Sequence, residues 1–234
     1  MTYREHPPAP ALAPWLACTW ERVGSGGPPV RVLPDGCIDI VWTQGVLTQI
    51  VGANTTAFLV PVAPGAHVVG ARMRPGAAPS LLGIPGELVL DVRVPIDELL
   101  GSAGSRLGAT LEGADQPVAA LREWLACCAA RSERPDPLIR AAVERLDRRA
   151  DDVAGLAREL GVSGRGLRRR MTAAIGYGPK RLGRVLRLWR ALEAARAGAE
   201  LGRVAFDYGY ADQAHFSGDC RELAGVAPSM LLSE

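Results

Sequence analysis

Two segments of the sequence share one pattern, which begins with Ala157-Arg-Glu-Leu-Gly161 in the first copy and Ala205-Phe-Asp-Tyr-Gly209 in the second. In each copy a polar residue follows the glycine, then apolar residues at i and i+4, then a second glycine with a proline three residues beyond it. The distance from alanine to proline is 22 residues in the first copy and 23 in the second. Such internal similarity indicates one supersecondary unit that is used twice.

The first half of each copy predicts a helix, a tight turn and the start of a new helix. Glycine adopts the left-handed conformation that ends many helices without steric cost, which we expect at Gly161 and Gly209. The side-chain oxygens of Ser163 and Asp212 can then accept hydrogen bonds from the free N–H groups of the next helix. The apolar stripe of the new helices consists of Leu167 and Met171 in the first copy, and Phe216 and Cys220 in the second.

The second half of each copy predicts where these helices stop. Gly176 and Gly225 end them, and a proline can begin the following helix because its missing N–H would be unpaired there. A helix, a glycine turn and a capped helix form the helix-turn-helix unit. We therefore predict two such units, at about residues 153–175 and 201–224, joined by a long helix over residues 180–197.

Positive charge is concentrated in and after the first unit. Residues 158–190 hold ten basic side chains and one acidic side chain, Glu159, so their formal charge is +9. The ten are Arg158, Arg165, Arg168, Arg169, Arg170, Lys180, Arg181, Arg184, Arg187 and Arg190. A cluster of this kind is typical of contact with a phosphate backbone. A solvated basic face is the alternative, and the duplicated helix-turn-helix pattern favours nucleic acid.

Residues from about Leu138 to Leu232 resemble the DNA-binding domain of AraC/XylS-type bacterial transcription regulators. The resemblance is carried by Asp207-Tyr-Gly-Tyr-Ala-Asp-Gln-Ala-His-Phe-Ser217 and Leu223-Ala-Gly-Val-Ala-Pro228. It implies seven helices in two subdomains, with two recognition helices in successive major-groove segments on one face of DNA. By position, the candidates for reading base edges are Arg165, Arg168, Arg169, Asp212, Gln213, His215 and Ser217. The candidates for phosphate contacts are Arg170, Lys180, Arg181 and Arg184.

Two positions depart from the pattern of that family. Gly218 stands where an arginine is usual, and Cys220 stands where an apolar aromatic residue is usual. Glycine inside a helix costs about 1 kcal/mol relative to alanine and supplies no donor to DNA. Because arginine reads guanine through two hydrogen bonds, we expect the first recognition helix to dominate readout and the second to read fewer bases.

Residues 1–131 predict a separate β-rich domain, followed by a linker over 132–137 and the DNA-binding domain over 138–234. Short β-type segments lie at residues 30–33, 37–42, 46–51, 58–60 and 67–73, separated by glycine and proline. Helices are expected over 77–82, 97–100 and 117–131, and a short helix or strand within residues 1–20. The fold class is thus α+β: a small barrel or curled sheet with short helices, then an all-α domain.

The role of the β-rich domain is predicted only by analogy. Residues 32–42 and 69–78 are similar to the N-terminal domain that precedes this DNA-binding domain in some AraC-type regulators. The analogy implies that it senses a small molecule or mediates dimerisation, and it supplies no ligand. The candidates for an effector pocket are Trp15, Trp20, Trp42 and His67.

A few residues of the N-terminal part could form a metal site or a reactive thiol, and each of them also has an ordinary structural explanation. His67, Asp35, Asp39 and Cys37 match no zinc spacing, and Asp35 suits the Pro-Asp-Gly turn in which it lies. The alternative function is a DNA-binding thiol sensor or alkyl acceptor acting through Cys37. It would need a lowered thiol pKa, and no Cys-His or Cys-x-x-Cys spacing supports one. We predict that the protein is not an enzyme and that it has neither a cofactor nor a metal site.

Composition sets the remaining expectations. The chain has 234 residues, enough for two domains, and charge differs between its halves: residues 136–234 carry +4 and residues 1–135 carry −2. No segment has 18 consecutive apolar residues, the first residues lack the apolar core of a signal peptide, and the five cysteines are irregularly spaced. We expect a cytoplasmic, reduced protein that binds double-stranded DNA and no membrane. A small-molecule effector, RNA polymerase and a second copy of the chain are the further candidate partners.

Overall fold

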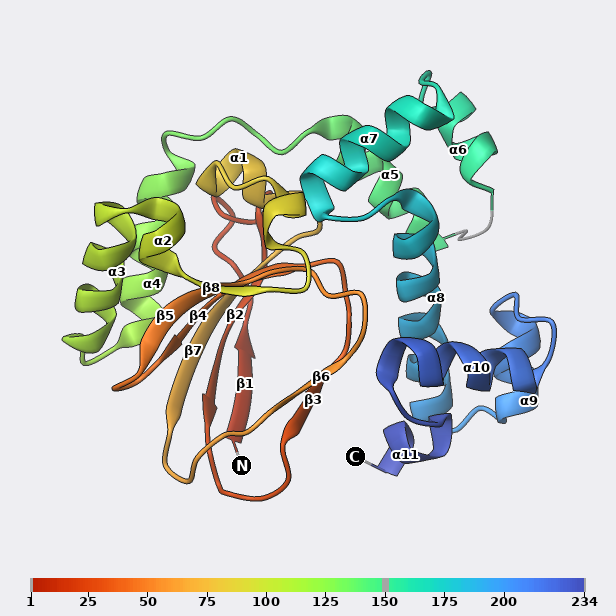
Figure 1. The fold of residues 1–234 in the computed structure, drawn as a ribbon, viewed down its shortest axis with the longest axis horizontal. Helices are drawn as coiled ribbons and strands as arrows, with labels where there is room; N and C mark the ends of the chain where they lie inside the picture. The colour runs from red at the N-terminus through yellow and green to blue at the C-terminus, as the bar shows by residue number, and fades with distance from the viewer. Residues whose placement is uncertain (1, 149–151, 234) are drawn as a thin grey trace.

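The computed structural model describes residues 2–148 and 152–233, so the predicted domain ends at residues 1 and 234 lie outside the described residues. The described chain is α+β, with a β-rich N-terminal part and a helical C-terminal part (Figure 1). None of its helices is long and apolar enough to cross a membrane.

The N-terminal part is built on an antiparallel sheet of six strands. The strands are β1 (Thr2–His6), β2 (Leu16–Val23), β4 (Ile38–Thr43), β5 (Leu47–Val51), β7 (His67–Met73) and β8 (Arg93–Pro95), in the order β1-β2-β7-β4-β5-β8. Among residues 2–148 and 152–233, pairing stops at β1 and β8, so the sheet is open. Two further strands, β3 (Val30–Val32) and β6 (Phe58–Val60), pair only with each other, toward the helical part (Figure 1).

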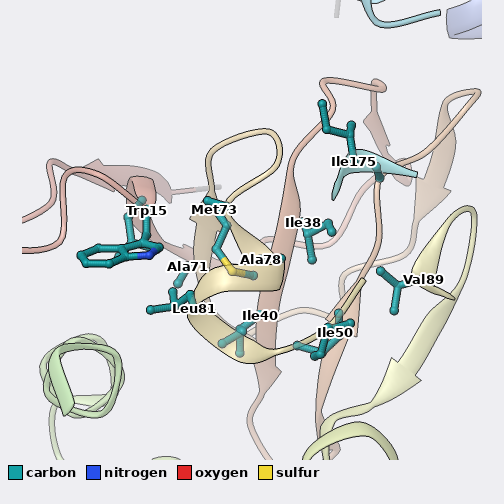
Figure 2. Packing of buried hydrophobic residues seen from close by; sticks show 14 of the residues in the cluster. Trp15, Ile38, Ile40, Ile50, Ala71, Met73, Ala78, Leu81, Val89 and Ile175 are labelled. Carbon is teal, nitrogen blue, oxygen red and sulfur yellow. The ribbon is translucent and has the colours of Figure 1, made fainter. Parts of the chain in front are cut away.

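The two faces of the sheet differ in polarity because successive side chains of a strand point to opposite sides. On one face Ile40 of β4 lies between Ala71 of β7 and Ile50 of β5, and all three are buried. Helices cover this face: α1 (Ala78–Leu82), α2 (Ile96–Leu100), α3 (Ser102–Glu112) and α4 (Pro117–Ala129). Figure 2 shows Ala78 and Leu81 of α1 beside these sheet residues. The opposite face carries charged groups, including Asp39 and Arg72.

The C-terminal part consists of seven helices within the described ranges. They are α5 (Pro137–Arg148), α6 (Val153–Glu159), α7 (Gly164–Ile175), α8 (Pro179–Arg196), α9 (Leu201–Asp207), α10 (Gln213–Ala224) and α11 (Pro228–Ser233). Helix α8 connects two groups, with α5–α7 at one end and α9–α11 at the other (Figure 1). The first group shares one hydrophobic core with the sheet domain, while the second packs in a separate core around Phe216 and Leu223, which also includes Leu33 of the N-terminal part.

The structure confirms the α+β fold class and the two helix-turn-helix units, and it favours the curled sheet over the barrel. It also contains elements that the sequence pattern did not predict: β1, β8, α3 and a 3-10 helix, η1 (Gly86–Val89). Strand β1 is polar and almost wholly exposed, so it has no apolar alternation. Helix α3 contains Gly104 and Gly108, which weaken the helical signal.

Candidate nucleic-acid interface

The turns of both helix-turn-helix units have the predicted geometry. Gly161 and Gly209 adopt left-handed conformations, with φ of 67° and 74°. The hydroxyl of Ser163 accepts from the Gly166 N–H at 3.1 Å, and the Asp212 carboxylate accepts from the His215 N–H at 2.7 Å. These side chains cap α7 and α10, so the predicted helix starts are confirmed.

The buried stripes of α7 and α10 orient the helices. Leu167 and Met171 of α7, and Phe216 and Cys220 of α10, have no exposed surface. Gly176 and Gly225 end the two helices with φ of 106° and 77°. Because these stripes face the protein, the opposite side of each recognition helix faces solvent.

The exposed side of α7 carries three arginines, Arg165, Arg168 and Arg169. They lie at i, i+3 and i+4, which places them on one helix face. Gly178 makes room for the stem of Arg168, since a Cβ at Gly178 would lie 3.2 Å from Arg168 Cγ. The arrangement presents guanidinium groups outward, as reading a major groove requires.

The exposed side of α10 is less basic. Asp212, Gln213 and His215 are exposed, and Ser217 is partly buried. The Ala211 N–H donates to Nδ1 of His215 at 3.2 Å, so in a neutral ring the proton is on Nε2, which can donate to a base. At Gly218 a Cβ would meet no atom within 4 Å, so the missing side chain leaves open surface on this helix.

Three of the four candidate phosphate contacts already have partners within the protein. Arg170 lies 2.6 Å from an Asp136 oxygen, Arg181 lies 3.2 Å from Glu222, and Arg184 lies 2.6 Å from both Asp219 and Glu222. Lys180 is exposed and makes no hydrogen bond or ion pair with any residue that the structure describes. The geometry therefore separates Lys180 from the other three.

Sequence reasoning missed Asp219, the acidic residue that organises the second unit. It is 4% exposed and accepts from Nη2 of Arg184 at 2.6 Å and from Nη2 of Arg187 at 3.1 Å. Its position between Phe216 and Cys220 places a carboxylate beside the apolar stripe of α10. A carboxylate at a position that faces the core is a sign, visible in the sequence, of a buried ion pair.

The candidate effector residues do not gather in one pocket. The indole of Trp15 donates to Ser80, that of Trp20 donates to Asp39 on the charged face of the sheet, and that of Trp42 donates to Glu112. Trp42 and His67 are neighbours, with ring centroids 5.9 Å apart. Trp42 also lines a hollow of about 440 Å³ between the β4–β5 hairpin and α3.

The charged face of the sheet holds a cluster around Arg72. Its Nε lies 3.5 Å from an oxygen of Asp35 and 3.5 Å from an oxygen of Asp39. Beside it, burial and the carboxylates of Asp35 and Asp39 raise the pKa of the Cys37 thiol well above its usual value. Since the thiolate is the reactive form, this environment gives no support to the thiol-sensor alternative. Among the residues described, no three His, Cys, Asp or Glu side chains form a group that could hold a metal ion.

The Asp39 carboxyl, whose side chain is 14% exposed, predicts that stability depends on pH. Burial raises its pKa to about 7, and the nearby Arg72 guanidinium only partly opposes this shift. Between the unfolded value of about 4 and the folded value, the folded state binds more protons than the unfolded state, so stability falls as pH rises, by up to about 1.4 kcal/mol per unit. The stabilisation is complete below the unfolded pKa and is lost above the folded one.

Thermal unfolding between about pH 5 and pH 8 checks this prediction. We expect the melting temperature of the wild-type protein to fall with pH across this range, and that of Asp39→Asn to fall less. Asp97→Asn, which changes an exposed carboxyl on α2, is the matched control. Parallel curves for wild type and Asp39→Asn would contradict the prediction.

Each of the two parts of the chain matches a known family model. Residues 156–234 match a family model described as a helix-turn-helix domain, and residues 4–95 match one described as a domain of unknown function (DUF6597). A search of curated protein sequences finds no match.

Several solved structures are similar to parts or all of this chain. The C-terminal domain of AraT, a response regulator from Geobacillus stearothermophilus, is 23% identical over 42% of this chain and 85% of that chain, with a TM-score of 0.39. A probable AraC family transcriptional regulator from Rhodopseudomonas palustris CGA009 is 24% identical over 42% of this chain and 96% of that chain, with a TM-score of 0.38. ToxT from Vibrio cholerae is 11% identical over 100% of this chain and 98% of that chain, with a TM-score of 0.49.

The helical part is a tandem helix-turn-helix domain, as its two capped units and the match over residues 156–234 show. The helix-turn-helix domain that residues 156–234 match is of the AraC type, and residues 4–95 match a domain family without an assigned role.

Proposed function

We propose that the protein is a sequence-specific, DNA-binding transcription regulator in which α7 and α10 enter successive segments of the major groove. The observation that carries the proposal is the pair of capped recognition helices whose buried stripes turn Arg165, Arg168 and Arg169 of α7, and Gln213 and His215 of α10, toward solvent. Phosphate contacts position such a domain, and contacts to base edges specify the sequence. Acting on chromosomal DNA implies a cytoplasmic protein.

Selection of genomic fragments by the purified full-length protein, followed by footprinting, tests this proposal. We expect a protected site with two segments about one helical turn apart, because each recognition helix occupies one major-groove segment. Weak binding without any preferred sequence would contradict it.

The N-terminal domain is the proposed site of control, by a small molecule or through a second copy of the chain. The hollow beside Trp42 supports the small-molecule part, because it combines an indole wall and the exposed Val46 with the Glu112 carboxylate. Contact with RNA polymerase remains a prediction.

Arg168→Ala is expected to relax specificity at one base position of the site by about 1–3 kcal/mol, because it removes a bidentate reader of guanine. Lys180→Ala is the matched comparison, since Lys180 is an exposed cation near the first turn of α8. Its loss should weaken all sequences about equally. Binding measured on the selected site and on each single-base variant separates the two effects. If Arg168→Ala weakens all sequences equally, its role in base reading is wrong.

A further inference from the structure

Both recognition helices end against the N-terminal domain. At the end of α7, a Cβ on Gly86 of η1 would lie 2.6 Å from the Ala174 oxygen, so the two backbones are in close contact. Ile175 belongs to the same buried cluster as Ile38 and Val89 of the N-terminal domain, and Figure 2 shows the three in one view. The first recognition helix is therefore packed into the core of the sheet domain.

The end of α10 is held by hydrogen bonds. The last carbonyls of a helix have no partner within it and need donors from elsewhere. Here the N-terminal domain supplies two: the Ala57 N–H donates to the Leu223 oxygen at 2.7 Å, and Nη1 of Arg31 donates to the Ala224 oxygen at 2.9 Å. The Arg31 guanidinium also places positive charge at the helix C-terminus, where the helix dipole favours it.

The connecting helix α8 is held by the same domain. The indole of Trp189 donates to the Pro34 oxygen at 2.7 Å, and Arg181 donates to the Thr55 oxygen. Because the two helix-turn-helix units lie at opposite ends of α8 (Figure 1), their relative orientation depends on α8 and on what else touches both units. The N-terminal domain touches α7, α8 and α10.

These contacts leave the reading surfaces uncovered. Arg165, Arg168 and Arg169 are exposed, as are Gln213 and His215, although both helix ends are held. A domain that holds two recognition helices at their C-terminal ends and leaves these side chains exposed can orient the helices without blocking them.

We propose that Arg31 and the backbone of Ala57 are positioning residues for DNA binding: they hold α10 in register with α7 so that both helices engage one site together. This inference rests on the proposed function and deepens it, because it makes the N-terminal domain a template for two-segment recognition. Holding both helices in place before binding lowers the entropic cost of association with DNA.

The test uses the full-length protein, footprinted on its selected site and on a site with the α10 segment scrambled. Arg31→Ala should lose protection of the α10 segment while keeping that of the α7 segment, and its affinity should fall about 10- to 100-fold, as expected when one of two linked contacts is lost. Its affinity for the scrambled site should match that of the wild type. Arg31→Lys, which keeps a cationic donor, should recover part of the loss.

Two further variants keep the test decisive. Ala57→Pro removes the N–H that donates to the Leu223 oxygen and leaves Arg31 unchanged. It should give the same footprint as Arg31→Ala. Arg106→Ala removes an exposed arginine of α3 that bonds within its own helix, and it should behave as wild type. Circular dichroism verifies that each variant is folded.

The outcomes separate the two proposals. If the wild type protects no site, the proposed function fails. If the wild type protects two segments and both Arg31→Ala and Ala57→Pro still do so with unchanged affinity, only the positioning role fails. A gain of affinity in these variants would also overturn it, since the contact would then restrain α10.

Discussion

Replacing Asp219 by alanine is expected to lower the free energy of unfolding by about 3–5 kcal/mol, the usual cost of removing one partner from a buried ion pair. Asp219 is 4% exposed and Arg187 is 8% exposed, and their side chains lie 3.1 Å apart. The Arg187 guanidinium also donates to the Gly209 oxygen and lies over the Tyr210 ring, 4.3 Å from its centre. Without Asp219 this buried cation loses the Asp219 carboxylate, and it cannot turn to solvent without breaking its contacts to Gly209 and Tyr210.

Denaturant unfolding followed by circular dichroism measures the loss. Glu222→Ala is the matched control, because it removes another carboxylate of α10 that contacts Arg184 but is half exposed. Exposed ion pairs contribute about 0–1 kcal/mol, so the control should change little. If Asp219→Ala costs no more than Glu222→Ala, the buried pair does not stabilise the second unit.

The helix-turn-helix units could be predicted from sequence because their signals are local. A left-handed glycine, a capping side chain and an apolar i, i+4 pair act within a few residues of each other, and Gly209 and Asp212 adopt the predicted conformations. Strand β1 could not be predicted in this way. Its polar residues are held by backbone pairing with β2, which begins ten residues after β1 ends.

The chemistry of the site was predictable only in part, for a related reason. Sequence shows how many arginines α8 carries, and not which of them face a carboxylate. Arg184 and Arg187 meet Asp219, which is contributed by α10 and lies more than 30 residues away. Whether a cation is available to DNA is thus decided by tertiary contacts.

The salt dependence of DNA binding measures how many of these cations are available to phosphates. If all ten cations of residues 158–190 neutralised phosphates, the slope of log K against log salt would be about −9. Five of the ten are bonded within the protein. They are Arg170, Arg181, Arg184, Arg187 and Arg190. The other five have no such bond to any part of the chain that the structure describes, and they are Arg158, Arg165, Arg168, Arg169 and Lys180.

With at most five phosphates neutralised by this stretch, its expected contribution to the slope is no steeper than about −4.5, so through this stretch a fourfold rise in salt weakens binding about 500-fold, against roughly 300,000-fold for ten. Titration of the selected site at several salt concentrations gives the slope, and Lys180→Ala should reduce its magnitude by about 1. Arg170→Ala, which removes an arginine already paired with Asp136, should leave it nearly unchanged. A wild-type slope near −9 would contradict this limit; if the stretch itself supplies that slope, its paired arginines, Arg184 and Arg187 among them, exchange their carboxylates for phosphate. Helix α10 would then lose its anchor on α8 when DNA binds, because the same two arginines hold it there.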